Sequence, residues 1–267
     1  GSGGGGAGGV LTGTMPIGGG LTIPVTVGSG GVAGLRTPIA GTATSGGDST
    51  FGPTITAYGG GKGSDGANLG LPEPGDAAIG GSGGGGGYLD NSGADGLNPT
   101  TPTGNVAPFT NYTPGTTQGY AGGDYTGAPN YSGGGGGGAG GAGVTGAKAH
   151  GGIGVQMPAT FQNPNAMSYA KGYPGPGSPG LFWVGGGGGG GTYNSPVTGG
   201  GKGGNGPTDS GDPYAGGGDG GASTTATRSA GWVTAGREFS GGGGGGSAQQ
   251  SNARNGGSGI VLVAYPT

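Results

Sequence analysis

The chain contains no cysteine, few charged residues and no long apolar run, and each absence excludes a class of protein. Without cysteine the fold has no disulfides and no thiolate metal sites, which leaves the redox compartment undetermined. Charged residues make up 7% of the chain and the net charge is -3, so the basic surface that nucleic acid requires is missing. No apolar run approaches the roughly 20 residues of a membrane span, no signal peptide is visible, and no window shows a helical period between capping residues.

Glycine dominates what is present, with 88 of the 267 residues. A segment without side chains buries no apolar surface, so it is ordered only where its amides bond to neighbouring segments. The glycines therefore predict a scaffold, and contacts with a partner are expected from the insertions between them. The uninterrupted tracts are Gly3 to Gly6, Gly83 to Gly87, Gly133 to Gly138, Gly185 to Gly191 and Gly241 to Gly246.

Two simpler interpretations of this composition are a collagen helix and a disordered chain. Collagen requires glycine at every third position, and Leu21 to Val27 contains none. Disorder agrees with the high glycine content and the low charge. Apolar runs bounded by turn residues, at Ile55 to Tyr58, Leu181 to Val184 and Ile260 to Tyr265, favour an ordered fold.

The sequence predicts a polyglycine II helix bundle or sandwich with a small all-β portion and little or no α-helix. Polyglycine II rods resemble polyproline II, with three residues per turn and about 3.1 Å of rise per residue, so their amides point in three directions toward neighbouring rods. Because ordering glycine costs about 0.5 to 1 kcal/mol more per residue than ordering alanine, apolar flanks must add stability. The predicted structural caps over the rod ends are Tyr88, Trp183, Trp232 and Phe239.

Strand signals lie mainly near the two ends of the chain. Val10 to Ile17, Leu21 to Val27 and Pro53 to Tyr58 are rich in Thr, Val and Ile, and Pro24 favours an edge position for its strand. The chain starts without a methionine, inside glycine-rich sequence, so we expect that an upstream part was removed or not included. One continuous unit is predicted, with three parts: a β-rich N-terminal portion at 1–61, a polyglycine-rod bundle with variable loops at 62–258, and a C-terminal β-strand at 259–267 that closes the fold.

Motifs for catalysis and metal binding do not rise above chance in a chain so rich in glycine. Ser82 has the spacing of a nucleophile elbow, but it lies in a glycine tract, and His150 is the sole histidine that could serve as its base. Asp209, Asp212 and Asp219 are near one another without a regular ligand spacing. We therefore expect no enzyme, no catalytic residues, no cofactor and no metal.

Tyrosine-rich insertions are the candidate binding surfaces. Tyrosine provides contact area at low entropic cost, and the small polar residues around it supply hydrogen bonds, as in adaptable binding loops. The alternative interpretation is that these tyrosines cap rods, and that the prolines beside them stiffen connections that bind nothing. The candidate receptor-binding residues are Tyr112, Tyr120, Tyr125, Tyr131, Tyr169 and Tyr173.

A succession of short motifs covers nearly the whole chain: Ala7 to Thr14, Ile23 to Gly28, Gly47 to Gly52, Ile55 to Gly61, Gly151 to Val155, Phe182 to Gly187 and Gly256 to Pro266. In this order they resemble the glycine-rich domain family, which is found in tailed-bacteriophage tail-fibre and adhesin proteins. The resemblance implies a polyglycine sandwich, in which layered polyglycine II helices display variable loops that bind host surface receptors.

The expected function is that of a non-enzymatic phage virion surface protein, a tail-fibre or adhesin component that binds a host surface glycan or outer-membrane protein. The expected location is the virion surface or the extracellular space. Other virion or fibre subunits are expected partners, including a homo-oligomer, whereas nucleic acid and membrane insertion are not. The alternatives are a purely structural extracellular fibre or virion decoration subunit and an ice-binding protein.

Overall fold

The computed structural model describes most of the glycine tracts and the chain beside them. Within this part there is no α-helix, which confirms the prediction of little or no helix, and the regular elements are short strands and one 3-10 turn. The described residues are 1–14, 20, 22–34, 43–53, 55–64, 76–87, 93, 118–127, 131–146, 149–162, 182–193, 203–204, 215–223, 233–248 and 252–265.

Strands β1 (Val25–Thr26), β2 (Ser49–Phe51) and β3 (Ile55–Ala57) form an antiparallel sheet in the order β1-β2-β3. Threonine and β-branched residues favour this pleated backbone. Pro24 directly precedes the edge strand β1, and its carbonyl accepts from Gly52 N–H at 2.9 Å. The edge position expected from Pro24 is therefore confirmed, because proline has no N–H to donate to a second neighbour.

Two further pairs of strands are present. β4 (Val155–Gln156) pairs antiparallel with β5 (Trp183–Val184), and the 3-10 turn η1 (Ala159–Phe161) follows β4. β6 (Thr192–Tyr193) pairs in parallel with β7 (Ala222–Ser223). The apolar cluster is small and lies at the β4–β5 pair, where Met157, Phe182 and Val184 are buried against Val10, Val155 and Phe161.

Most of the structure consists of extended glycine-rich segments joined by backbone hydrogen bonds that repeat every third residue. Along segment 1–9, Gly3, Gly6 and Gly9 all donate to segment 58–64. The residues between them donate elsewhere: Gly4 and Ala7 to segment 134–137, and Ser2, Gly5 and Gly8 to segment 241–247. One segment is thus held by neighbours on several sides, a pattern that a flat sheet with two neighbours per strand does not produce.

The close approach of these segments explains why side chains are missing. A Cβ on Gly4 would collide with the carbonyl of Gly188, and one on Gly243 would collide with the carbonyl of Gly5. Some small side chains are nevertheless buried among backbone, as for Ser82 and Ala7. Glycine is therefore required at the collision sites by packing against neighbouring backbone.

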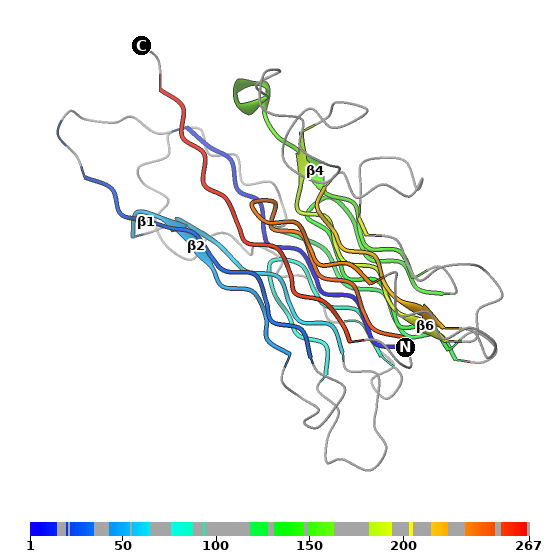
Figure 1. Ribbon diagram of the computed structural model, residues 1–267. Coiled ribbons are helices and arrows are strands. Elements are labelled where there is room, and N and C mark those ends of the chain that lie inside the picture. Colours follow the sequence, from blue (N-terminus) through cyan, green and yellow to red (C-terminus); the bar gives the residue numbers. More distant parts are fainter. Residues whose placement is uncertain are drawn as a thin grey trace.

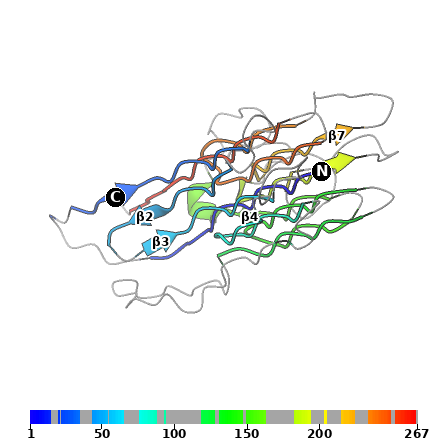
Figure 2. The ribbon, with the colours of Figure 1, turned by 90° about the horizontal axis from the view of Figure 1, so that it is seen from below.

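The segments run side by side between two ends of the molecule (Figure 1). One end, the N-terminal end, holds Gly1, β6 and β7, and the other end, the sheet end, holds β1, β2, β3 and the described C-terminal residues (Figures 1 and 2). Viewed from below, the segments form stacked rows (Figure 2). The N-terminal segment lies between other segments, because it is bonded to 58–64, 134–137 and 241–247.

One expectation about the ends of the chain needs correction. Residues 259–265 form no strand, although Ile260 to Tyr265 has high β propensity; Gly259 N–H donates to Gly28 O at 3.0 Å, and no such bond continues along the segment. Propensity alone does not order a strand that lacks a paired neighbour. The N-terminal portion 1–61 contains β1, β2 and β3, and its first segment, 1–9, is integrated into the hydrogen-bonded glycine segments.

Candidate binding site

The structure places three of the six candidate receptor-binding tyrosines, and it does not gather them at one site. Tyr120 lies toward the sheet end and is 40% exposed. Its N–H donates to Gly138 O at 3.2 Å. Tyr125 and Tyr131 are half-buried and flank the Thr126–Ser132 bridge near Gly1. The Tyr131 carbonyl accepts from the Gly1 amino group at 3.2 Å. Tyr112, Tyr169 and Tyr173 lie outside the described residues.

The predicted aromatic caps differ from the aromatic residue that the structure buries. Phe239 precedes the last glycine tract but is 52% exposed, so its ring is not a buried plug. Trp183 is half-buried in β5, whereas its neighbour Phe182 is buried in the apolar cluster. Phe182 directly precedes β5 with a positive φ of 47°, and this local turn of the backbone places its ring with Val184 in the apolar cluster. Tyr88 and Trp232 lie outside the described residues.

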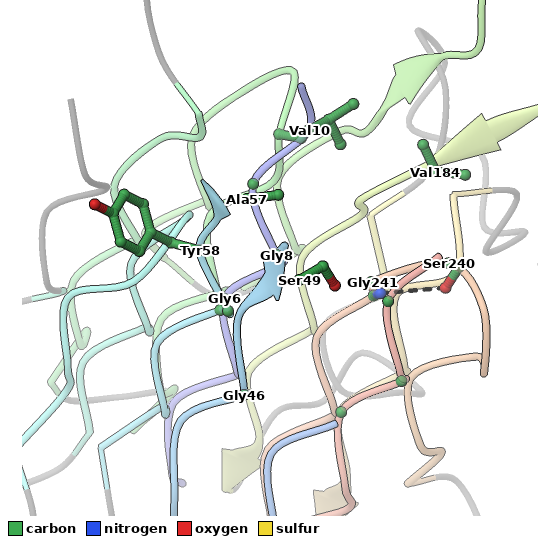
Figure 3. Close-up of a pocket in the computed structure, with 18 of the residues that line it drawn as sticks. Gly6, Gly8, Val10, Gly46, Ser49, Ala57, Tyr58, Val184, Ser240 and Gly241 are labelled. Atoms are coloured by element: carbon green, nitrogen blue, oxygen red, sulfur yellow. Dashed lines mark hydrogen bonds between the residues drawn. The ribbon is translucent and has the colours of Figure 1, made fainter. Parts of the chain in front are cut away.

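A ring of glycine-rich segments surrounds a hollow with a volume of about 950 Å³. Hydrogen bonds close this six-segment ring between every pair of neighbours, for example Gly5 to Gly244 at 2.9 Å and Gly256 to Gly31 at 3.0 Å. Figure 3 shows part of its wall, including the hydrogen bond from Gly242 N–H to Ser240 Oγ at 3.1 Å. In order around the ring, the segments are 1–9, 58–64, 43–49, 28–34, 252–260 and 241–247.

The hollow is lined by glycine-rich backbone within the ring and by larger apolar side chains toward the sheet end. There its lining includes Val10, Phe51, Ile55, Val184 and Leu262. Such a concave surface with an apolar part and backbone polar groups is typical of a binding site. Sequence reasoning missed this site, since the residues that form it come from stretches that lie far apart along the chain.

Charge is sparse around the hollow. Lys62 and Arg254 are the charged residues in its lining, and neither makes an ion pair with another described residue. Within the described part of the chain, no group of three or more His, Cys, Asp or Glu could hold a metal ion. Asp209 and Asp212 lie outside that part, and Asp219 accepts from Gly203 N–H at 2.8 Å through Oδ1.

Asp219 is one of three aspartates with the same hydrogen-bonding arrangement, which sequence reasoning also missed. Asp48, Asp124 and Asp219 each follow two glycines. Each Oδ1 accepts a backbone N–H from a glycine of another segment, at 2.8 to 3.0 Å. These carboxylates supply acceptors for segment amides that lack a carbonyl partner. The Gly-Gly-Asp triplet is the sequence signal that marks them.

The serine with the nucleophile-elbow spacing, Ser82, lies inside the packed glycine segments. Ser82 is fully buried among glycine backbone, and its Oγ has no hydrogen-bond partner. Its N–H donates to Ala7 O at 2.9 Å, which fixes it inside the bundle. A serine placed in this way is closed to a substrate.

Comparison of the chain with family models, with curated proteins and with solved structures gives no significant match. No helix within the described residues is long and apolar enough to cross a membrane.

Proposed function

We propose that the glycine-rich segments form a polyglycine II bundle, which serves as a rigid scaffold for the insertions between them. The repeat of three in the hydrogen bonds of segment 1–9 supports this conformation, since polyglycine II has three residues per turn. A crystal structure would test it by the backbone angles of the tracts. We expect φ and ψ in the polyproline II region, whereas the more negative φ of a pleated strand would contradict the proposal.

The protein is proposed to be a non-enzymatic virion surface component of the tail-fibre or adhesin type, which binds a host surface receptor through its insertions. The observation that supports this function is that the glycine-rich segments and the insertions between them differ in how they use their polar groups. The backbone N–H and carbonyl groups of the glycine-rich segments bond to one another. Examples are the bonds from Gly136 N–H to Gly188 O and from Gly189 N–H to Gly218 O, both 2.8 Å. Recognition therefore falls to residues outside the tracts, such as the exposed Tyr120.

The proposed receptor is a host surface glycan or outer-membrane protein. Tyrosine rings stack on sugar faces or on apolar protein surface, and their hydroxyls bond to polar groups of the receptor. A rigid support lowers the entropic cost of binding, because less of the binding surface must be ordered on contact.

Binding of the purified chain to envelope fractions from candidate host bacteria tests this function. We expect saturable binding that falls at least tenfold when the candidate tyrosines are replaced by serine. Tyr265→Ser is the matched control, since Tyr265 is 73% exposed and lies outside the tyrosine-rich insertions. Absence of saturable binding to every host fraction would contradict the receptor role.

A purely structural fibre or decoration subunit is the second candidate function. The exposed apolar residues Leu262, Val263 and Tyr265 favour it, because an extended segment with free backbone groups is suited to pairing with another chain. Copy number separates the two functions. An adhesin is expected in a few copies per particle, whereas a fibre subunit repeats many times.

A further inference from the structure

Segment 1–9 has hydrogen-bonded neighbours on every side except the one that faces the hollow. It donates to 58–64, 134–137 and 241–247, and it accepts from 82–85 and 188–191. The carbonyls of Ser2, Gly4, Gly5 and Ala7 are used in this way.

Three of the remaining carbonyls of this segment lie on its unoccupied side. Gly3, Gly6 and Gly9 are three residues apart, and no described group donates to their carbonyls. Because residues three apart point in the same direction in these segments, the three carbonyls share one side. That side lies between segments 58–64 and 241–247, where the hollow is.

Other members of the six-segment ring contribute unpaired donors. The N–H groups of Gly31, Gly60 and Gly244 have no hydrogen-bond partner among the described residues, and all three residues line the hollow. They come from alternate segments of the ring, namely 28–34, 58–64 and 241–247. Gly244 is buried, and Gly31 and Gly60 are half-buried. An amide held away from water without a partner costs free energy, so donors arranged in this way favour an acceptor at the centre.

Four glycines at the hollow lack the steric reason that explains glycine elsewhere in these segments. A Cβ on Gly5, Gly46 or Gly256 would meet nothing closer than 3.2 to 3.3 Å, and the nearest atoms are the unpaired nitrogens of Gly244, Gly60 and Gly31, respectively. Gly8 is freer still, with its nearest contact at 3.6 Å. Glycine disfavours order relative to alanine, so its presence here points to an occupant that needs the space.

We propose that the hollow is a docking site for a seventh extended segment, supplied by a separate partner polypeptide. Its carbonyls accept from Gly31, Gly60 and Gly244, and its amides donate to Gly3, Gly6 and Gly9. The part among the ring glycines is itself glycine, since backbone surrounds it. The part at the sheet end carries apolar β-branched side chains, which contact Val10, Phe51 and Leu262.

Two observations support the chemistry of this occupant, and a third favours a separate partner over a second copy. The site is continuous with the hydrogen-bonded packing of the six-segment ring, so an extended backbone completes an existing pattern. Lys62 and Arg254 in the lining, without a carboxylate, favour an acidic group on the occupant. The described glycine-rich segments of a second copy are already bonded within its own bundle. About seven glycines, with a rise of about 22 Å, span the ring.

Peptide binding to the whole chain tests the proposal. The probe is a synthetic peptide with an aspartate, six glycines and an alternating Val-Thr tail, made in both chain directions. We expect one of the two to bind saturably and to slow amide exchange of Gly31, Gly60 and Gly244 at least tenfold. The same peptide with alanine in place of glycine is expected not to bind, because its methyl groups collide with the ring.

Variants of the chain give the matched control. Gly8→Ala and Gly46→Ala place a methyl group at the hollow with little local crowding, so we expect folded protein with at least tenfold weaker binding. Gly127→Ala, where a Cβ meets nothing within 4 Å, is expected to bind as the parent does. If Gly46→Ala does not fold, Gly8→Ala still tests whether a methyl group in the hollow weakens peptide binding.

Three results would overturn the proposal. One is failure of both peptides to bind folded protein at millimolar concentration. Another is strong protection of the three amides in a monomer without peptide, which would mean that the chain's own residues fill the hollow. The third is a stable dimer in sedimentation with the same protection, which would assign the site to a second copy.

Discussion

Glycine residues in this chain differ in what an added side chain would meet, and this difference determines their importance. Gly243 is packed so that a Cβ would collide with Gly5 O and lie 2.8 Å from Gly188 N. Gly127 faces open space. The composition gives no difference between Gly243 and Gly127, whereas the tertiary structure shows that only Gly243 is packed against other backbone.

Gly243→Ala is expected to destabilise the fold by about 3 kcal/mol or more, because rigid backbone on two sides must move apart. Gly127→Ala is expected to change stability by less than about 1 kcal/mol, through the entropy of the unfolded chain alone. Urea unfolding of both variants measures the difference. Equal effects would contradict the packed backbone described above.

The amino group of Gly1 predicts a pH dependence for the chain with a free N-terminus. Burial lowers the pKa of this group from 8.0 to about 6. Between these values the unfolded chain binds the extra proton, so stability rises with pH from about 6 to 8, by up to about 3 kcal/mol.

Free energies of unfolding at pH 5.5 and 8.5 measure this rise. An N-acetylated chain is the control, since it keeps His150 and all carboxylates but has no amino group to titrate. The same rise in the acetylated chain would assign the effect to other residues.

At the scale of elements, the N-terminal end of the bundle contains a short ladder with buried hydroxyls. Ser132 bridges both Thr126 and Thr192, the first residue of β6. Ser132 and Thr192 are fully buried, and the hydroxyl oxygens of all three residues have no hydrogen-bond partner. Unpaired buried hydroxyls cost stability, because they lose hydrogen bonds to water.

Thr192→Val is therefore expected to stabilise the protein by about 1 kcal/mol, since valine has the same shape without the hydroxyl. Thr192→Ser, which keeps the hydroxyl and removes a methyl group, is expected to destabilise it by a similar amount. Thermal unfolding measures both. A clear loss of stability in Thr192→Val would mean that the hydroxyl has a partner.

Elements near the two ends of the chain show where local sequence preference is enough to predict a strand and where it is not. The edge position predicted from Pro24 follows from the missing N–H of proline alone, and β1, which follows Pro24, is an edge strand. The segment Ile260 to Tyr265 has stronger strand propensity than β1, but forms no strand because pairing depends on which chain lies alongside. Strand existence is thus a property of the neighbour as much as of the segment.

For the whole molecule, stability rests on backbone hydrogen bonds more than on an apolar interior. Among the residues that the structure describes, the buried hydrophobic ones are mostly alanine, and the larger ones are Met157, Phe182, Val184 and Val233. Unfolding will therefore expose much peptide surface and little apolar surface. Peptide exposure lowers the heat-capacity change, whereas apolar exposure raises it.

We expect a heat-capacity change of unfolding per residue well below the ordinary value of about 12 to 15 cal/mol/K. Differential scanning calorimetry over a range of pH values measures it. An ordinary value would contradict the small apolar contribution and would require a larger core in the intact protein.

The sequence by itself determined the absence of α-helix in the described residues, the dependence of the glycine tracts on backbone hydrogen bonds to neighbouring segments, and the edge position of the strand that follows Pro24. These properties follow from local chemistry: glycine has no side chain to bury, and proline has no N–H. Only the tertiary structure decided that the N-terminal segment lies among five others, that Phe182 rather than Trp183 or Phe239 is buried, and that six stretches enclose a hollow. Glycine tracts carry no side-chain pattern that specifies their neighbours, so their arrangement depends on the three-dimensional register of backbone hydrogen bonds.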